Sequence, residues 1–228
     1  MKDIIRIGNG QGFWGDSIDA PVNLAKDGPL DYLTLDYLAE VTLSIMQRQK
    51  LNNSNAGYAR DFIDLVKRIL PEIQENGLKV ITNAGGVNPQ TCREKLLELS
   101  EDSGNKIKIG VIQGDDIYQD IQAIRDKGIT FDHMDSGQSF DEIVDKVYSA
   151  NVYINSFTIS EALEKGAQIV LAGRVSDPGL ALGPCVYEFG WKNDEYNKIA
   201  AGTLAGHITE CGAQCTGGNF TNWQDVPD

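Results

Sequence analysis

The chain has 228 residues, 41% of them hydrophobic and 23% charged, which is the composition of an ordinary globular protein. This length provides one large or two small domains with an ample core. The formal net charge of −13 argues against nucleic acid or an anionic membrane as the main partner, although a local pocket can still bind a small anion.

The sequence shows no targeting or membrane-spanning signal. No apolar run approaches the roughly 20 residues that a membrane helix needs, and the N-terminus becomes polar too quickly for a signal peptide. The four cysteines lack the density of a disulfide scaffold. We therefore expect a cytoplasmic protein with free thiols and no membrane partner.

Strand-like and helix-like patterns alternate along the chain. Strands are expected at residues 4–8, 33–38, 79–82, 107–112, 152–154 and 169–172, and residues 33–38 could instead open a helix that continues to residue 49. Helices are expected at residues 58–76, 89–99, 158–166, 178–188 and 194–211, with a further one that ends near residue 127. This alternation predicts an α/β fold with a mainly parallel, Rossmann-like sheet flanked by helices. Residues 128–142 are expected to form a surface loop or a small insertion.

Local signals predict how several of these helices begin or break. Pro71 lies inside the apolar stripe of residues 58–76 and should kink or interrupt that helix. Thr158 and Glu161 have the spacing of a capping box. Asp177 followed by Pro178 is typical of an N-cap with proline at the first helical position.

The predicted strand ends share glycine and amide chemistry. In open α/β sheets, ligands bind beyond the carboxyl ends of the strands, and glycine lets a backbone approach a ligand closely. The candidate ligand-binding residues are Gly8, Asn9, Gly10, Gly12, Asp36, Asn83, Gly85, Gly86, Gly114 and Gly173, with Asp16, Asp115 and Arg174 as candidate catalytic residues. The alternative is that these glycines serve only tight strand-to-helix turns.

The stretch IRIGNGQGFWGD, residues 5–16, fails as a dinucleotide-binding fingerprint. Gly8 and Gly10 match the first and third glycines, but Phe13 stands at the sixth position. We therefore expect no NAD or FAD. Phe13 and Trp14 either form an apolar wall of a pocket or pack as ordinary core.

Charged and metal-ligating side chains allow more than one interpretation. Arg174, between a buried strand and a helix start, suits a carboxylate or phosphate, or forms a structural ion pair with Asp177. Helical spacing places four possible zinc ligands on one face, His207, Glu210, Cys211 and Cys215, but a packed helix end accounts for that spacing too. A magnesium site of Asp16, Asp36, Asp115 and Asp116 competes with helix capping by Asp115. We predict no metal site.

The chain resembles the acyclic terpene utilisation (AtuA) family, once a domain of unknown function. The matching stretches are GFWGDSIDAPVNLAKDGPLDYLTLDYLAE, KVITNAGGVNP, IGVIQGDD, EALEKGAQIVLAGRVSDPGLALGPCVYEFGW and AAGTLAGHITECGAQCTGG, which together span nearly the whole chain. Relatives often have arginine where this chain has Ser17, and they usually continue past the Thr-Gly-Gly segment at residues 216–218. The resemblance thus implies a single AtuA-like N-terminal α/β domain over residues 1–228, either truncated relative to the family or a reduced member of it.

The resemblance implies a role in the catabolism of branched acyclic terpenoids, alongside acyl-CoA carboxylases and hydratases. Our first hypothesis is an enzyme that acts on a small organic acid or a branched acyl thioester, in the hydratase, lyase or hydrolase range; a CoA thioester fits as its substrate. Asp16 or Asp115 would transfer protons, Arg174 would bind an anionic group, and glycine amides would form an oxyanion site. The alternatives are a non-catalytic subunit that binds an enzyme of the pathway and the magnesium-dependent enzyme; an oligomer is compatible with each.

Overall fold

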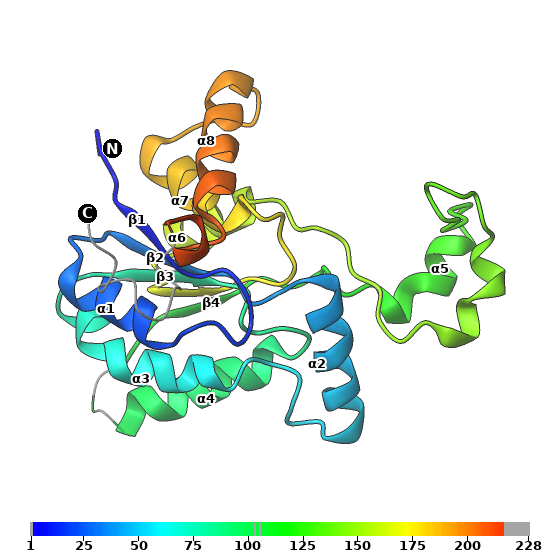
Figure 1. Cartoon of the computed structure of the whole chain (residues 1–228), viewed down its shortest axis with the longest axis horizontal. Helices are drawn as coiled ribbons and strands as arrows, with labels where there is room; N and C mark the ends of the chain where they lie inside the picture. The colour runs from blue at the N-terminus through cyan, green and yellow to red at the C-terminus, as the bar shows by residue number, and fades with distance from the viewer. Residues whose placement is uncertain (1, 103, 105, 217–228) are drawn as a thin grey trace, which may run out of the picture.

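A computed structural model describes residues 2–102, 104 and 106–216. Five strands in this part of the chain form one all-parallel sheet in the order β1-β2-β3-β5-β4 (Figure 1). The strands are β1 (Ile7–Gln11), β2 (Tyr32–Leu35), β3 (Lys79–Thr82), β4 (Ile109–Val111) and β5 (Ile169–Leu171). The predicted α/β fold with a parallel sheet flanked by helices is confirmed.

Helices cover both faces of the sheet (Figure 1). The α-helices of the described residues are α1 (Asp19–Asp27), α2 (Glu40–Asn52), α3 (Asp61–Gln74), α4 (Pro89–Asp102), α5 (Ile121–Arg125), α6 (Phe157–Glu164), α7 (Gly179–Phe189), α8 (Tyr196–Thr209) and α9 (Ala213–Thr216). Helices α1, α3 and α4 lie on one face, and α6 and α7 lie on the other, with α8 packed against α7. No described helix combines the length and the apolar character that crossing a membrane requires.

Helix α3 shows how the apolar pattern produces the core. Its predicted stripe is buried against the sheet from Phe62 to Ile73. Pro71 does not interrupt the helix, which continues to Gln74. Pro71 and Lys67, four residues earlier, both lie on the exposed side, where water can satisfy the carbonyl group that proline leaves without a donor.

The first two strands differ in extent from the prediction, and a glycine inside β1 permits close packing of a helix. The expected strand at residues 4–8 instead runs from Ile7 to Gln11, so Gly8 and Gly10 lie inside it rather than in a loop. A Cβ atom on Gly10 would lie 2.4 Å from Pro21 Cβ, so this glycine lets α1 pack directly on β1. Residues 33–38 do not open a helix, because β2 ends at Leu35 and α2 begins separately at Glu40.

Three further local predictions are wrong. Residues 152–154 form no strand, but only the isolated bridge between Ile154 and Val175. The capping box at Thr158 is absent, because α6 already begins at Phe157 and the Thr158 hydroxyl donates to the Asn155 carbonyl at 2.6 Å. Asp177 is not the N-cap of α7, since its carboxylate accepts from Arg174 instead.

Residues 117–150 form an arm that projects from the body between β4 and α6 (Figure 1). A bridge between Asp116 and Asn151 closes its base. The arm contains α5 and three short 3₁₀ turns, η1 (Tyr118–Asp120), η2 (Phe140–Glu142) and η3 (Val144–Lys146), and it replaces the longer helix expected up to residue 127. All of its residues are described, and Phe140 alone among them is buried.

Candidate functional site

The centre of the candidate site is a pair of buried polar side chains at the carboxyl ends of β2 and β3. Asp36 follows β2 and Asn83 follows β3, so the parallel pairing of these strands brings the two side chains together. The Asn83 amide donates to Asp36 Oδ1 at 2.7 Å, and its oxygen accepts from the Tyr37 backbone at 2.7 Å. The backbone N–H of Leu38 also donates to Asp36 Oδ1, at 3.0 Å. The hydrogen bonds from Asn83 and Leu38 thus use the same carboxylate oxygen of Asp36.

The environment of Asp36 adjusts its acidity. Burial raises the pKa of Asp36 from 3.8 to about 6, and the negative charge of Glu210 adds to this effect. The hydrogen bonds from Asn83 and Leu38 and the positive charge of Arg174 act in the opposite direction. A carboxyl group with a pKa near neutrality can both donate and accept a proton at physiological pH. Asp36 therefore has the properties of a general acid/base.

Arg174, on the loop after β5, brings a buried positive charge to the same edge. It is 5% exposed, and its guanidinium contacts the Asp177 carboxylate at 3.2 Å and the Glu40 carboxylate at 3.6 Å. The guanidinium carbon lies 4.7 Å from the centre of the Tyr153 ring. The ion pair with Asp177, one of the two interpretations of Arg174, is therefore present. Arg174 Nε is nevertheless buried without a partner among the described residues, which leaves a donor for an anionic ligand.

Asp115 holds the loop that carries Arg174. Its Oδ2 atom accepts from the Arg174 backbone N–H at 2.9 Å and from the Asn151 amide at 3.0 Å. Gly173 makes this contact possible, because a Cβ atom there would lie 2.0 Å from Asp115 Oδ1. The geometry gives Asp115 a positioning role toward Arg174, at the closed base of the arm.

Asp16 closes the glycine loop after β1. Its two carboxylate oxygens accept from the backbone of Ser17 at 2.8 Å and of Gly12 at 3.3 Å. The end of α8 covers this loop, because the Asn9 amide donates to the Glu210 carbonyl at 2.5 Å. A Cβ atom on Gly12 would lie 2.8 Å from the Cys211 carbonyl oxygen, so glycine is required for this close approach.

The two aromatic residues of this loop take different positions. Trp14 packs against the core and donates to the Asp61 carboxylate at 3.1 Å, which agrees with the interpretation as core. Phe13 is 45% exposed.

Four other predicted glycines serve local packing or turns. Gly8 lies against Leu30, Gly85 against Pro89, and Gly86 against Met46 and Gly57. Gly114 has a φ of +116°, a conformation that favours glycine, and nothing lies within 4 Å of its Cβ direction. The simpler interpretation of these glycines thus accounts for their geometry.

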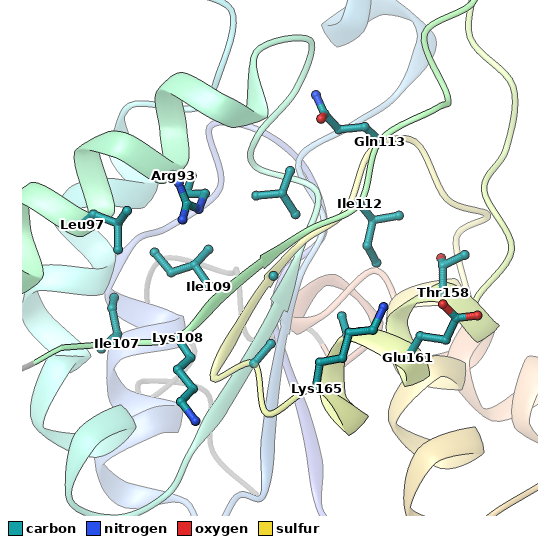
Figure 2. A pocket seen from close by; sticks show the side chains of 14 residues that line it. Arg93, Leu97, Ile107, Lys108, Ile109, Ile112, Gln113, Thr158, Glu161 and Lys165 are labelled. Carbon is teal, nitrogen blue, oxygen red and sulfur yellow. The ribbon is translucent and has the colours of Figure 1, made fainter.

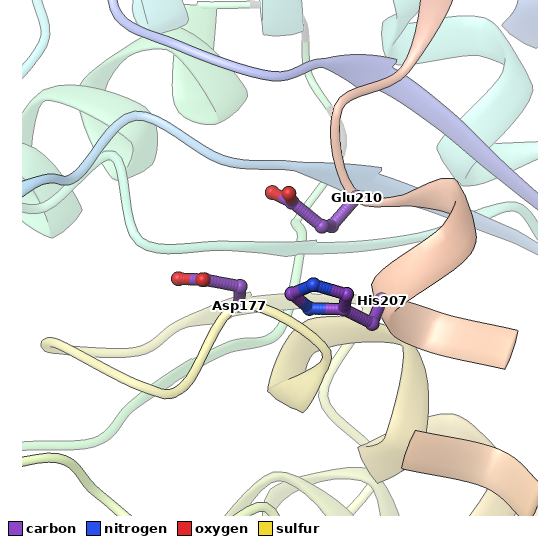
Figure 3. A group of neighbouring side chains, drawn as sticks. All are labelled: Asp177, His207 and Glu210. Atoms are coloured by element: carbon purple, nitrogen blue, oxygen red, sulfur yellow. The ribbon is translucent and has the colours of Figure 1, made fainter. Parts of the chain in front are cut away.

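One group of possible metal ligands occurs among the described residues. Asp177, His207 and Glu210 present ligand atoms that lie within 4.8 Å of one another (Figure 3). The helical spacing pointed to His207 and Glu210 but paired them with Cys211 and Cys215. Asp177 was not predicted as their neighbour, because it comes from a different element, 30 residues before His207.

Cys211 and Cys215 do not join this group, and their thiols form hydrogen bonds with neighbouring residues. The Cys211 thiol donates to the Glu210 carboxylate at 2.8 Å, and the Cys215 thiol donates to the Ile208 carbonyl at 3.1 Å. The hydrogen bond to Glu210, together with burial, raises the pKa of the Cys211 thiol to about 12, so this cysteine stays protonated. The four acidic residues of the alternative magnesium site do not form a cluster in the described structure.

The fold and the site define a class of protein: an α/β protein with a single parallel sheet and a polar, partly buried cluster at the carboxyl edge. The chain matches the family described as "Acyclic terpene utilisation family protein AtuA" over residues 5–228. It therefore belongs to the AtuA family, as the resemblance indicated, and this description assigns it to acyclic terpene utilisation. Neither a curated protein nor a solved structure gives a significant match.

Proposed function

We propose that the chain is an enzyme of acyclic terpenoid catabolism that hydrates, or in reverse dehydrates, a small unsaturated acid or a branched acyl thioester. The observation that carries this proposal is the buried Arg174 guanidinium, with its unpartnered Nε, at the same sheet edge as the general acid/base candidate Asp36. Arg174 supplies a binding point for an anionic or oxygen-rich end of the substrate, and Asp36 supplies proton transfer. The CoA thioester as substrate and the place in a terpenoid pathway rest on the family.

Hydration fits this site because it needs one group that both donates and accepts a proton. Protonated Asp36 would donate its proton to the α-carbon of a conjugated double bond, while a water oxygen bonds to the β-carbon. The water then returns a proton to the Asp36 carboxylate, so the net reaction is the addition of one water molecule. Arg174 would stabilise the negative charge that gathers on the carbonyl or carboxylate oxygen during this step.

A nucleophilic hydrolase is less well supported. Cys211, at the rim of the cluster, keeps its proton because of Glu210, and a thiol needs to be deprotonated to attack a carbonyl group. Asp16 and Asp115, the acids first expected to act in catalysis, hold backbone groups in place. We therefore assign proton transfer to Asp36 and positioning to Asp115.

The test is turnover of branched, α,β-unsaturated thioesters of the geranyl and citronellyl type. Asp36→Asn should lower kcat by about 10²- to 10⁴-fold, since it removes the proton-transfer group. Arg174→Gln should lower kcat/KM by at least about 10²-fold, since it removes the charge opposite the developing anion.

Asp31→Asn is the matched control, because Asp31 lies at the opposite, amino end of β2, where it accepts from Lys2 and from the Arg6 backbone. Its activity should equal that of the unmodified chain. If Asp36→Asn and Arg174→Gln turn over a substrate as fast as the control, the assignment of the site is wrong.

A further inference from the structure

The β4 edge of the sheet borders a groove that the candidate active site does not use. A cavity of about 650 Å³ lies along β4, between α4 and α6 (Figure 2). Its apolar wall includes Leu97, Ile109 and Ile112. Strand β4 pairs with β5 on one side in the described structure, and its residues are partly exposed where those of β5 are buried.

The backbone along this groove can still accept another chain. The neighbouring strand β5 bonds to Lys108 and Ile112 of the β4 segment, through the N–H of Ile169, the carbonyl of Leu171 and the N–H of Gly173. Because bonding directions alternate along a parallel strand, the N–H and C=O groups of Ile109 and Val111 point away from β5. Such an exposed edge is a template for an added extended segment.

The groove is basic in an acidic protein. Three basic residues line it, Arg93, Lys108 and Lys165. Among the described lining residues, Glu161 alone is acidic. None of the three cations forms an ion pair with another described residue, although the whole chain carries a net charge of −13. This local charge favours an acidic occupant.

The arm is acidic and exposes apolar side chains, and in both respects it complements the basic, partly apolar groove. Residues 117–150 contain seven acidic and three basic residues. Large apolar side chains are exposed on it, with Met134 94% exposed and Ile129 53% exposed. A segment of this length with one buried side chain does not bury enough apolar surface to offset its ordering on its own.

We propose that the arm of one chain docks in the β4 groove of a second copy of the same chain. Two such contacts, each arm in the other's groove, form a closed two-fold dimer. Direct pairing of groove with groove is disfavoured, because it would bring the two sets of cations together. The arm projects away from the body that carries it (Figure 1), so a second body is in reach of its exposed side chains.

Charge reversal tests this dimer by analytical ultracentrifugation and native mass spectrometry of the full chain. The groove variant carries Lys108→Glu and Lys165→Glu, and the arm variant carries Asp135→Lys and Asp145→Lys. Each variant alone should dimerise at least about tenfold more weakly than the unmodified chain. An equimolar mixture should form a heterodimer, because the acidic arm then meets a basic groove and the basic arm meets an acidic groove.

The control variant carries Lys26→Glu and Lys67→Glu, on the exposed sides of α1 and α3, and should dimerise as the unmodified chain does. The mixture separates a broken interface from a folding defect, since misfolded variants would not recover on mixing. A monomeric unmodified chain, dimers unaffected by the reversals, or a mixture that stays monomeric would each overturn the proposal. Because activity is not the readout, this result is independent of the proposed hydration.

Discussion

The carboxyl edge of the sheet and the arm arrange polar and apolar groups in opposite ways. At the edge, Asp36, Asn83 and Arg174 are almost completely buried, and most of their polar atoms have partners within the chain. On the arm, apolar side chains such as Met134 and Tyr148 are exposed to solvent.

Each arrangement costs free energy unless it is compensated. Buried charges need hydrogen bonds or a ligand, and exposed apolar groups gain from a partner that covers them. The contrast assigns the two regions different tasks: the edge is built for a small polar ligand, and the arm for another protein surface. Three substitutions test how far this contrast holds, beginning with the edge.

The largest effect is expected at Gly173. A Cβ atom there would overlap Asp115 Oδ1, at 2.0 Å, so Gly173→Ala must displace either the carboxylate or the loop of Arg174. We expect a loss of about 3 kcal/mol in the free energy of unfolding, as for other overpacked sites. Urea denaturation followed by circular dichroism measures it. A loss below about 0.5 kcal/mol would show that the edge is not tightly built.

An intermediate effect is expected from the titration of Asp36. Its pKa is raised from 3.8 to about 6 in the folded chain. The folded state thus holds the proton more tightly than the unfolded state, so this group's contribution to stability is complete below about pH 4 and is lost as the pH rises through 6. Asp36→Asn removes this dependence.

Stability curves between pH 4 and pH 7 measure that change. Relative to Asp36→Asn, the unmodified chain should lose on the order of 2 kcal/mol over this interval. Asp31→Asn, whose carboxylate lies at the other end of β2, should keep the dependence that Asp36 causes. Parallel curves for the unmodified chain and Asp36→Asn would mean that Asp36 titrates as an ordinary exposed acid.

The smallest effect is expected on the arm. Met134 contacts little of its own chain, so Met134→Ser should change the free energy of unfolding of the dilute monomer by less than about 0.5 kcal/mol. The same substitution should weaken dimerisation, because it removes apolar surface from the proposed interface. Denaturation at low concentration and sedimentation at high concentration separate the two results. A large loss in the monomer would place Met134 in a core rather than at an interface.

Local sequence patterns predicted those features that depend on neighbouring residues. The strand at residues 79–82 and the buried stripe of α3 agree with the structure because each follows from one periodicity. Asp36, Asn83 and Arg174 were expected near one another because parallel strands end at the same edge.

The remaining features depend on contacts between distant segments. Asp177 joins His207 and Glu210 only because the loop after β5 and the end of α8 meet. Tyr153 reaches Arg174 from a segment in which the sequence shows no recognisable motif, and Glu40 reaches it from the start of α2. The outcome at Asp177 is local instead: of the two roles expected for it, helix cap and ion pair with Arg174 three residues earlier, the structure shows the ion pair.

The bond between Asn9 and the Glu210 carbonyl joins residues 201 positions apart. A growing polypeptide leaves the ribosome from its N-terminus, so β1 and its glycine loop emerge long before the helix end that covers them. The loop must remain uncovered until residue 210 has been synthesised. The loop is therefore covered only after α8 has been synthesised, and nascent chains lacking α8 should expose it to chaperones.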